Sequence, residues 1–363
     1  MRTIASLVLA TSLVGPGVIP QQVRPTEASQ PVSRSWIVFA TDIVRRTKPT
    51  PPAQARLYAY VSSTYADVLS ATKSSSEASE ATRLVLEAVV PDERRAIRAT
   101  ATALHARPLS KRGQAVADRF LARAAADGFR PDDPTQDMNA APVGIGKWVR
   151  RDAGPLAPSA GGWQRWALPS DFSANVPPPL APTDGEAYEA QKQAVREASA
   201  RRDAAWQAVI DFWGGAPGTE GPAGIWLNRL WTRLQGNKIE RNDLAFAMAQ
   251  KALAQTLADA FMECWKIKFQ YWTERPDMAV PGLTTAMKNP PFPSYVSGHS
   301  TVSAAAATVL GRLFPTQAAS FMGDAEQARD SRLYAAIHFP MDNDAGFALG
   351  KRVGAAEISA MHL

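Results

Sequence analysis

Apolar residues recur every three to four positions along most of the chain, which is the period of an α-helix. In the first half the pattern predicts a short helix from Ser35-Trp36 to the prolines at 49–52, then helices starting at Pro51 and at about 78–90, 92–106 and 111–127. The strict alternation that is typical of a half-buried strand occurs nowhere. The sequence therefore predicts an all-α fold.

The second half continues the helical pattern. Thr183-Asp-Gly-Glu186 has the form of a capping box and predicts a helix that runs to about Trp213. Further helices are predicted around Ile225–Leu234 and, after an Asn242/Asp243 cap, as far as about Trp272. We expect antiparallel helical bundles around one large core, in which residues 35–182 and 183–363 form a single domain.

Residues 131–182 interrupt the helical pattern. They contain ten of the chain's 28 prolines, with Trp148, Trp163 and Trp166 between them. The alternative, a disordered linker, is disfavoured because such linkers are poor in aromatic residues. We therefore predict a long irregular segment that lies on the surface and is pinned there by its tryptophans.

Composition narrows the class of protein. The 363 residues are 45% hydrophobic and 20% charged, with a formal net charge of +6. The basic residues are spread along the chain without a Lys/Arg block, so we expect no nucleic-acid partner. A single cysteine, Cys264, excludes a disulfide framework and a cysteine-based zinc site.

The first residues have the character of a targeting segment. Met1–Ile19 contains one Arg followed by the apolar run IASLVLATSLVG, as in a secretory leader. We expect residues 1–28 to be a leader and the protein to be exported, to the periplasm or the cell exterior. No other run of 18 uncharged apolar residues occurs, so no membrane span is expected.

Ser297-Gly298-His299 precedes a small, apolar, helical run that continues to Gly311. Ser297 is therefore predicted to cap a buried helix, with His299 in its first turn. The unpaired N–H groups at a helix start attract an anion, on which a histidine can donate or move a proton. Alone, the motif is more often a plain helix cap.

Two basic residues lie on, or just beyond, the apolar face of the helix predicted to end near Trp272. Lys268 continues that face three residues after Trp265, and Arg275 comes seven residues later, before Pro276, which we expect to stop the helix. Buried cations are costly unless an anion compensates them. Snorkelling or a structural salt bridge would also explain them.

The third block contains Ser331-Arg332 and His338, followed by Asp342. We expect the helix before it to end near His338 because Pro340 follows. Arg332 and His338 are six residues apart, so they converge only if that helix ends or bends between them. Asp342 can accept from one ring nitrogen of His338 and leave the other free as a nucleophile or ligand. A lone histidine would more often be a satisfied core residue.

Together the blocks supply three cations, a helix start and two histidines, and we interpret them as a site for a tetrahedral oxyanion. Seven residues would surround it: the cations Lys268, Arg275 and Arg332, the cap residues Ser297 and Gly298, His338 as the axial group, and His299 opposite it as acid or base.

The order K-x6-R-P, S-G-H, S-R-x5-H-x3-D resembles the three-part signature of the phosphatidic acid phosphatase type 2 / vanadium-dependent haloperoxidase superfamily. The motifs span about residues 265–342, and the upstream architecture more loosely resembles the soluble bacterial haloperoxidase-like branch. The family usually has Pro before S-G-H, where this chain has Val296. That position carries no reacting group, so the resemblance implies a changed loop and an intact site.

The resemblance implies two chemistries. As a vanadium haloperoxidase, the protein would bind vanadate through His338 and oxidise halide with hydrogen peroxide to halogenate an organic acceptor. As an acid phosphatase, it would hydrolyse soluble phosphate monoesters through a phosphohistidine without a cofactor. The third alternative is a non-catalytic oxyanion-binding protein. Many helical relatives are homodimers, but the sequence specifies no interface for one.

Aromatic residues favour the haloperoxidase. Trp265 and Phe292 occupy positions similar to those that line the halide pocket of chloride-oxidising relatives, although both would also suit an ordinary core. The stretch I-H-F-P-M-D at 337–342 is at least as typical of acid phosphatases. We take the haloperoxidase as the primary prediction.

Overall fold

The computed structural model describes residues 30–130, 141–151, 154–235 and 238–363. Within these ranges the chain forms thirteen α-helices and several short 3-10 turns, without a β-strand. The predicted all-α fold is confirmed. None of the helices described is both long and apolar enough to cross a membrane. The predicted leader, residues 1–28, lies outside the described residues.

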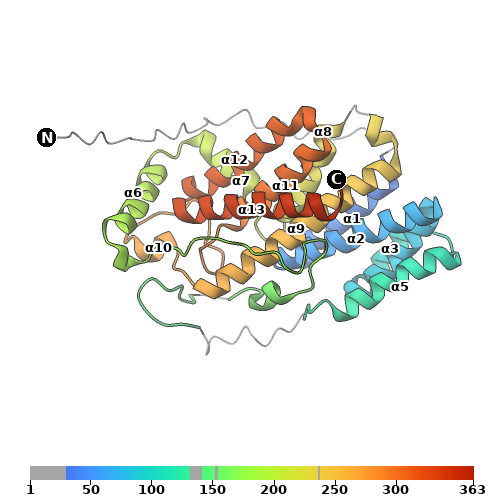
Figure 1. The fold of residues 1–363 in the computed structure, drawn as a ribbon, viewed down its shortest axis with the longest axis horizontal. Helices are drawn as coiled ribbons and strands as arrows, with labels where there is room; N and C mark the ends of the chain where they lie inside the picture. The colour runs from blue at the N-terminus through green and yellow to red at the C-terminus, as the bar shows by residue number, and fades with distance from the viewer. Residues whose placement is uncertain (1–29, 131–140, 152–153, 236–237) are drawn as a thin grey trace.

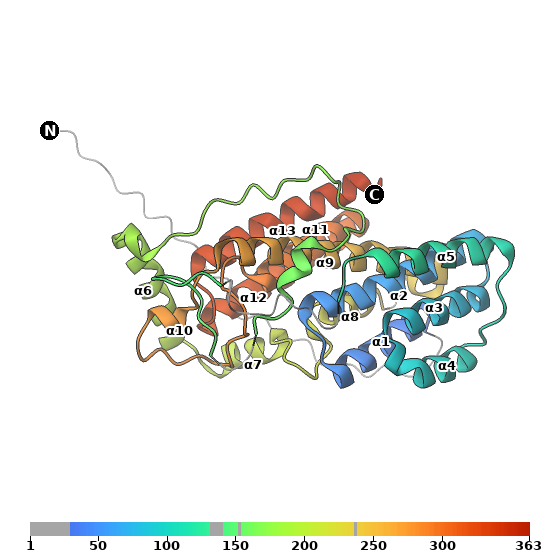
Figure 2. The ribbon, with the colours of Figure 1, turned by 90° about the horizontal axis from the view of Figure 1, so that it is seen from below.

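Five helices of the first half form one end of an elongated molecule (Figures 1 and 2). They are α1 (Val32–Thr47), α2 (Pro51–Thr72), α3 (Ser75–Val89), α4 (Arg94–Ala103) and α5 (Lys111–Ala126). The prolines predicted to start a helix do so, at the first positions of α2. There the missing N–H of a proline has no cost.

The helices of the second half form the rest of the body. They are α6 (Glu186–Ala200), α7 (Ala204–Trp213), α8 (Gly221–Leu234), α9 (Asp243–Tyr271), α10 (Pro276–Ala279), α11 (Gly298–Leu313), α12 (Ala318–Tyr334) and α13 (Pro340–Ala360). In Figure 1, α9 runs through the middle, α11 and α13 pack against it, and α12 packs against α11. One apolar core cluster contains residues from α1 through to α13.

The helix predicted from Glu186 to Trp213 is wrong in two respects. The chain breaks after Ala200, and Asp203 caps a second helix by accepting a hydrogen bond from the backbone N–H of Trp206 at 2.8 Å. The capping box is also absent. Pro182–Asp184 forms a 3-10 turn in which Asp184 accepts from the N–H of Ala181, so α6 begins after Gly185 without a side-chain cap.

Helix α9 ends close to the predicted residue, but Arg275 and Pro276 have other roles than predicted, and α12 ends earlier than predicted. Helix α9 ends at Tyr271, because Trp272 adopts a left-handed conformation with φ of 54°. Arg275 therefore lies beyond the helix, as the N-cap residue of α10, and Pro276 starts α10 instead of stopping α9. Helix α12 ends at Tyr334 and not near His338. That early end allows Arg332 and His338 to approach the same site.

Close packing of α11 against α13 fixes the centre of the molecule. A Cβ atom at Gly350 would lie 2.1 Å from the backbone oxygen of Thr301, and one at Gly346 would lie 2.7 Å from that of Ser297. Only glycine permits this approach. The start of α13 is thereby held against the start of α11, where the N–H of Ser297 donates to the backbone oxygen of Asp342 at 2.9 Å.

The described parts of the Pro- and Trp-rich segment, 141–151 and 154–182, contain no α-helix. Residues 154–182 run along the C-terminal bundle (Figure 2). Trp148 and Trp163 are buried, and Trp166 packs edge-on against Tyr60 with ring centroids 4.8 Å apart. Tryptophans therefore pin this segment to the helices, as predicted.

Candidate active site

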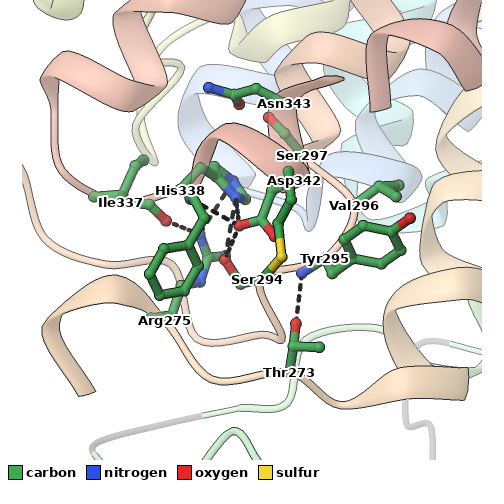
Figure 3. A network of polar contacts seen from close by, with 12 residues as sticks. Thr273, Arg275, Ser294, Tyr295, Val296, Ser297, Ile337, His338, Asp342 and Asn343 are labelled. Atoms are coloured by element: carbon green, nitrogen blue, oxygen red, sulfur yellow. Dashed lines mark hydrogen bonds and ion pairs between the residues drawn. The ribbon is translucent and has the colours of Figure 1, made fainter. Parts of the chain in front are cut away.

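His338 lies in the loop between α12 and α13, buried at the centre of a polar network (Figure 3). Its Nε2 is 3.1 Å from Nη1 of Arg275, and its Nδ1 is 3.1 Å from Oδ2 of Asp342. A guanidinium group can only donate, so Nε2 accepts and Nδ1 carries the proton that is donated to the carboxylate. Burial, followed by Arg275, lowers the pKa of His338, which keeps the ring neutral. The nitrogen that faces the cations is therefore the basic one.

Asp342 fixes that orientation from the first turn of α13. Its Oδ2 also accepts hydrogen bonds from the backbone N–H of Phe339 at 3.0 Å and from the hydroxyl of Ser294. Burial raises the pKa of Asp342 to about 6, against the effect of these donors. The contact expected between Asp342 and the His338 ring is present.

Ser294 is part of the network and was not predicted. Its hydroxyl lies 3.2 Å from Nδ1 of His338 and donates to Asp342 (Figure 3). The available signal was its position three residues before Ser297, in the same Pro- and aromatic-rich loop. The hydroxyl helps to hold the His338–Asp342 pair in place.

Arg275 bridges two loops and His338. Its Nε and Nη2 donate to the backbone oxygen of Phe292 at 3.1 and 3.0 Å, and its Nη1 donates to that of Ile337 at 2.8 Å. The side chain is fully buried, and burial lowers its pKa to about 10. The guanidinium thus remains a cation directly beside Nε2 of His338 at neutral pH.

Lys268 and Arg332 are equally buried. The Lys268 ammonium donates to the backbone oxygens of Pro293 and Ser294 at 2.8 and 2.7 Å. Arg332 donates to the Ser331 hydroxyl at 2.9 Å and, at 3.3 Å, to an oxygen of Ile210. Burial lowers the pKa of Lys268 to about 7 and that of Arg332 to about 9.

None of these three cations forms a salt bridge with a carboxylate in the described part of the chain. Their partners are carbonyl oxygens, a hydroxyl and a sulfur atom, none of which carries a full negative charge. Asp342 acts electrostatically on Lys268 and Arg275 and raises the pKa of both, but three buried cations around one buried carboxylate remain unfavourable. The donor set therefore fits an external oxyanion such as vanadate or phosphate.

Ser297 is the N-cap of α11, as predicted, and Gly298 is the first helical residue. The Ser297 hydroxyl accepts a hydrogen bond from the hydroxyl of Ser300 at 3.0 Å. The N–H of Ser297 donates to the backbone oxygen of Asp342. A Cβ atom at Gly298 would lie 3.6 Å from the ring of Trp265. The start of α11 therefore packs beside Trp265.

His299, in the first turn of α11, is partly buried and bonded on one side. Its Nε2 is 2.8 Å from the backbone oxygen of Trp213, which can only accept, so Nε2 carries the proton and Nδ1 is free. Burial and the nearby Arg332 lower the pKa of His299. The ring is therefore neutral and can take up a proton.

Trp265 and Phe292 lie together beside the cations. Their ring centroids are 4.8 Å apart, and Nζ of Lys268 lies 5.2 Å from the centroid of Phe292. The indole N–H of Trp265 donates to the oxygen of Leu156 at 3.0 Å, which fixes the ring. Their halide-binding role stays a prediction.

A cavity of about 270 Å³ reaches Arg275 from the side of α10. Its lining includes Trp148, Met278, Lys288 and Pro291. The cavity provides space for a small organic molecule next to a residue that touches His338.

Known proteins resemble this chain in part of its sequence and in its fold. The model of the PAP2 superfamily matches residues 244–362. A bacterial vanadium-dependent iodoperoxidase has a similar structure, with a TM-score of 0.75 at 18% identity, over 93% of this chain and 97% of that one. No curated protein matches the sequence.

Two structures of bacterial vanadium-dependent chloroperoxidase are also similar. The apo-type structure has a TM-score of 0.69 at 13% identity, over 86% of this chain and 93% of that one. The holo-type structure has a TM-score of 0.66 at 14% identity, over 94% of each chain. The superfamily inferred from the three motifs is thus confirmed. Residues 244–362 match the model of the PAP2 superfamily, and the chain as a whole has the all-α fold of the vanadium-dependent haloperoxidases.

Proposed function

We propose that this protein is a vanadium-dependent haloperoxidase-like enzyme, which oxidises halide with hydrogen peroxide at a vanadate bound to His338. The observation that carries the proposal is the basic nitrogen of His338 facing three buried cations that have no carboxylate partner. A lone pair that points into such a pocket suits the covalent attachment of a tetrahedral oxyanion. The fold shared with iodo- and chloroperoxidases adds support.

Several residues of this chain would bind the anion together. His338 would supply the covalent ligand, and Lys268, Arg275 and Arg332 would neutralise the anion's oxygens. Asp342 and Ser294 keep the His338 ring in the tautomer in which Nε2 is unprotonated. Bound vanadate would supply a Lewis acid that activates hydrogen peroxide toward halide.

His299 would handle protons. Its lowered pKa leaves Nδ1 unprotonated at neutral pH, so the ring can accept a proton from hydrogen peroxide as it approaches the anion. Its Nε2–H stays bonded to Trp213, which fixes the ring during the transfer. Trp265 and Phe292 would offer halide an apolar, water-poor surface beside Lys268.

The test is a steady-state assay on purified apoprotein with orthovanadate, hydrogen peroxide and bromide, in which bromination of a phenolic dye is followed. Hydrolysis of a generic phosphate ester is measured in parallel. Bromination that requires vanadate and is blocked by phosphate is the expected result. Hydrolysis without bromination, inhibited by vanadate, would overturn the proposal in favour of the phosphatase.

A further inference from the structure

Met287 lies against the candidate site without a role in the chemistry described above. It belongs to the loop between α10 and α11, which is tied to the end of α12 by a hydrogen bond from the N–H of Ala286 to the oxygen of Ala335 at 3.0 Å. This places the sulfur atom of Met287 3.3 Å from Nη1 of Arg332. The side chain is partly exposed.

The thioether is a poor partner for a buried guanidinium group. A thioether sulfur is only a weak acceptor, whereas Arg332 is fully buried and its other terminal nitrogen has a partner at 3.3 Å. Nη1 therefore keeps capacity for a stronger acceptor. Any oxygen atom added to the sulfur of Met287 would form next to that nitrogen.

The second sulfur near the site is protected. Cys264 is fully buried, its sulfur lies 3.6 Å from the oxygen of Val296, and burial raises the pKa of its thiol. Oxidants attack thiolates and accessible sulfur atoms. Met287 is thus a partly exposed residue whose sulfur contacts Arg332, whereas the sulfur of Cys264 is enclosed.

We propose that Met287 is an oxidation site whose sulfoxide weakens oxyanion binding at Arg332. Hypohalous acid would transfer its oxygen atom to the thioether, giving the sulfoxide with release of one halide ion and one proton. Sulfur loses two electrons, and the halogen gains them. The inference rests on the proposed function for its oxidant.

The sulfoxide oxygen is a strong acceptor, in contrast to the thioether sulfur. It would accept a hydrogen bond from Nη1 of Arg332 and compete with an oxygen atom of the bound anion. An enzyme that releases hypohalous acid faster than substrate consumes it would therefore lower its own anion affinity. Methionine sulfoxide reductase would restore it, because the sulfoxide is reversible.

The test uses reagent hypobromous acid on purified apoprotein, so that it does not depend on turnover. Orthovanadate and inorganic phosphate are each titrated by calorimetry before and after treatment, and peptide mass spectrometry locates the added oxygen. Wild type, Met287→Leu and Met248→Leu are compared. Met248 is a matched control because it is 43% exposed and lies on the first turns of α9, among residues of a separate pocket.

We expect treatment to weaken anion binding about tenfold in wild type and in Met248→Leu, and reductase to restore it. Met287→Leu should bind anion equally before and after treatment. Met287 left unmodified, an equal loss in Met287→Leu, or a protein that binds neither anion would overturn the inference. Failure of the proposed function is seen separately, as absence of vanadate-dependent bromination in an untreated sample.

Discussion

Helix α9 carries buried side chains of both charges. The chain supplies hydrogen-bond donors for the carboxylates Asp259 and Glu263, but its described part supplies no carboxylate partner for Lys268. Asp259 accepts hydrogen bonds from three successive backbone N–H groups, those of residues 166–168, at 2.8 to 2.9 Å. Glu263 accepts from the guanidinium group of Arg165. Further along the helix, Lys268 is fully buried and donates only to neutral carbonyl oxygens.

This difference separates the charges that the chain satisfies itself from those that we propose bind an external anion. The carboxylates of α9 fix the Pro- and Trp-rich segment and are satisfied by the chain itself. Each of the cations around His338 lowers the pKa of a neighbouring cation or of His338, so their proximity is unfavourable. Such a cluster lowers stability unless an external anion joins it, so it indicates a binding site.

The largest expected effect is on activity. His338→Ala removes the nitrogen that would bind the anion covalently, so catalysis of either reaction should fall to the background rate. His105→Asn is the control, because His105 is exposed and Asn tolerates its left-handed backbone. Bromination and ester hydrolysis are measured on both variants, and only His338→Ala should lose activity. A variant without His338 that still held vanadate as tightly would show that another residue is the ligand.

The next effect concerns the compensated side of α9. Asp259→Ala leaves three buried N–H groups without their acceptor and should lower the free energy of unfolding by about 3 kcal/mol. Urea unfolding measures it. Asp118→Ala, an exposed carboxylate on α5, should change stability little. Equal losses in the two variants would mean that Asp259 does not anchor the segment.

A pH-dependent effect, whose size depends on the pH of the measurement, is expected at Glu357 on α13. Its carboxyl group is buried, and burial, followed by Asp259, raises the pKa to about 11. Above the unfolded pKa of about 4.5 the unfolded chain releases a proton that the folded chain retains, so stability falls as pH rises toward 11.

Glu357→Gln should remove that loss, so the variant becomes progressively more stable than wild type between about pH 5 and pH 9. Thermal unfolding at a series of pH values measures the difference. Glu197→Gln, at an exposed position of α6, serves as the control and should track wild type. A constant difference across this range would contradict a neutral Glu357.

The smallest expected effect has the opposite sign to that of Asp259→Ala. Arg332→Met replaces an uncompensated buried cation with an apolar side chain and should raise the stability of the apoprotein by about 1 kcal/mol. Urea unfolding without any oxyanion measures it. A loss comparable to that of Asp259→Ala would show that Arg332 is a structural charge.

Local signals in the sequence were sufficient for the fold and for most of the site. Helical periodicity predicted the all-α class, and the caps at Asn242 and Ser297 lie where expected. Lys268 was identified because it continues an apolar face, and the burial of that face was predictable from its spacing. These features depend only on neighbouring residues.

The remaining features depend on contacts between distant segments. Trp272 ends α9 in a left-handed conformation that its residue type does not favour, and only this brings Arg275 to His338. Ser294 reaches Asp342 across 48 residues, and Met287 reaches Arg332 across 45. No periodic pattern or local motif encodes such contacts.

Calorimetric titration of the apoprotein with orthovanadate shows whether the buried cations bind an external oxyanion. We expect one anion bound per chain, displacement by phosphate, and binding weaker by about 2 kcal/mol in Arg332→Met. Absence of binding in wild type, or unchanged affinity in Arg332→Met, would contradict it.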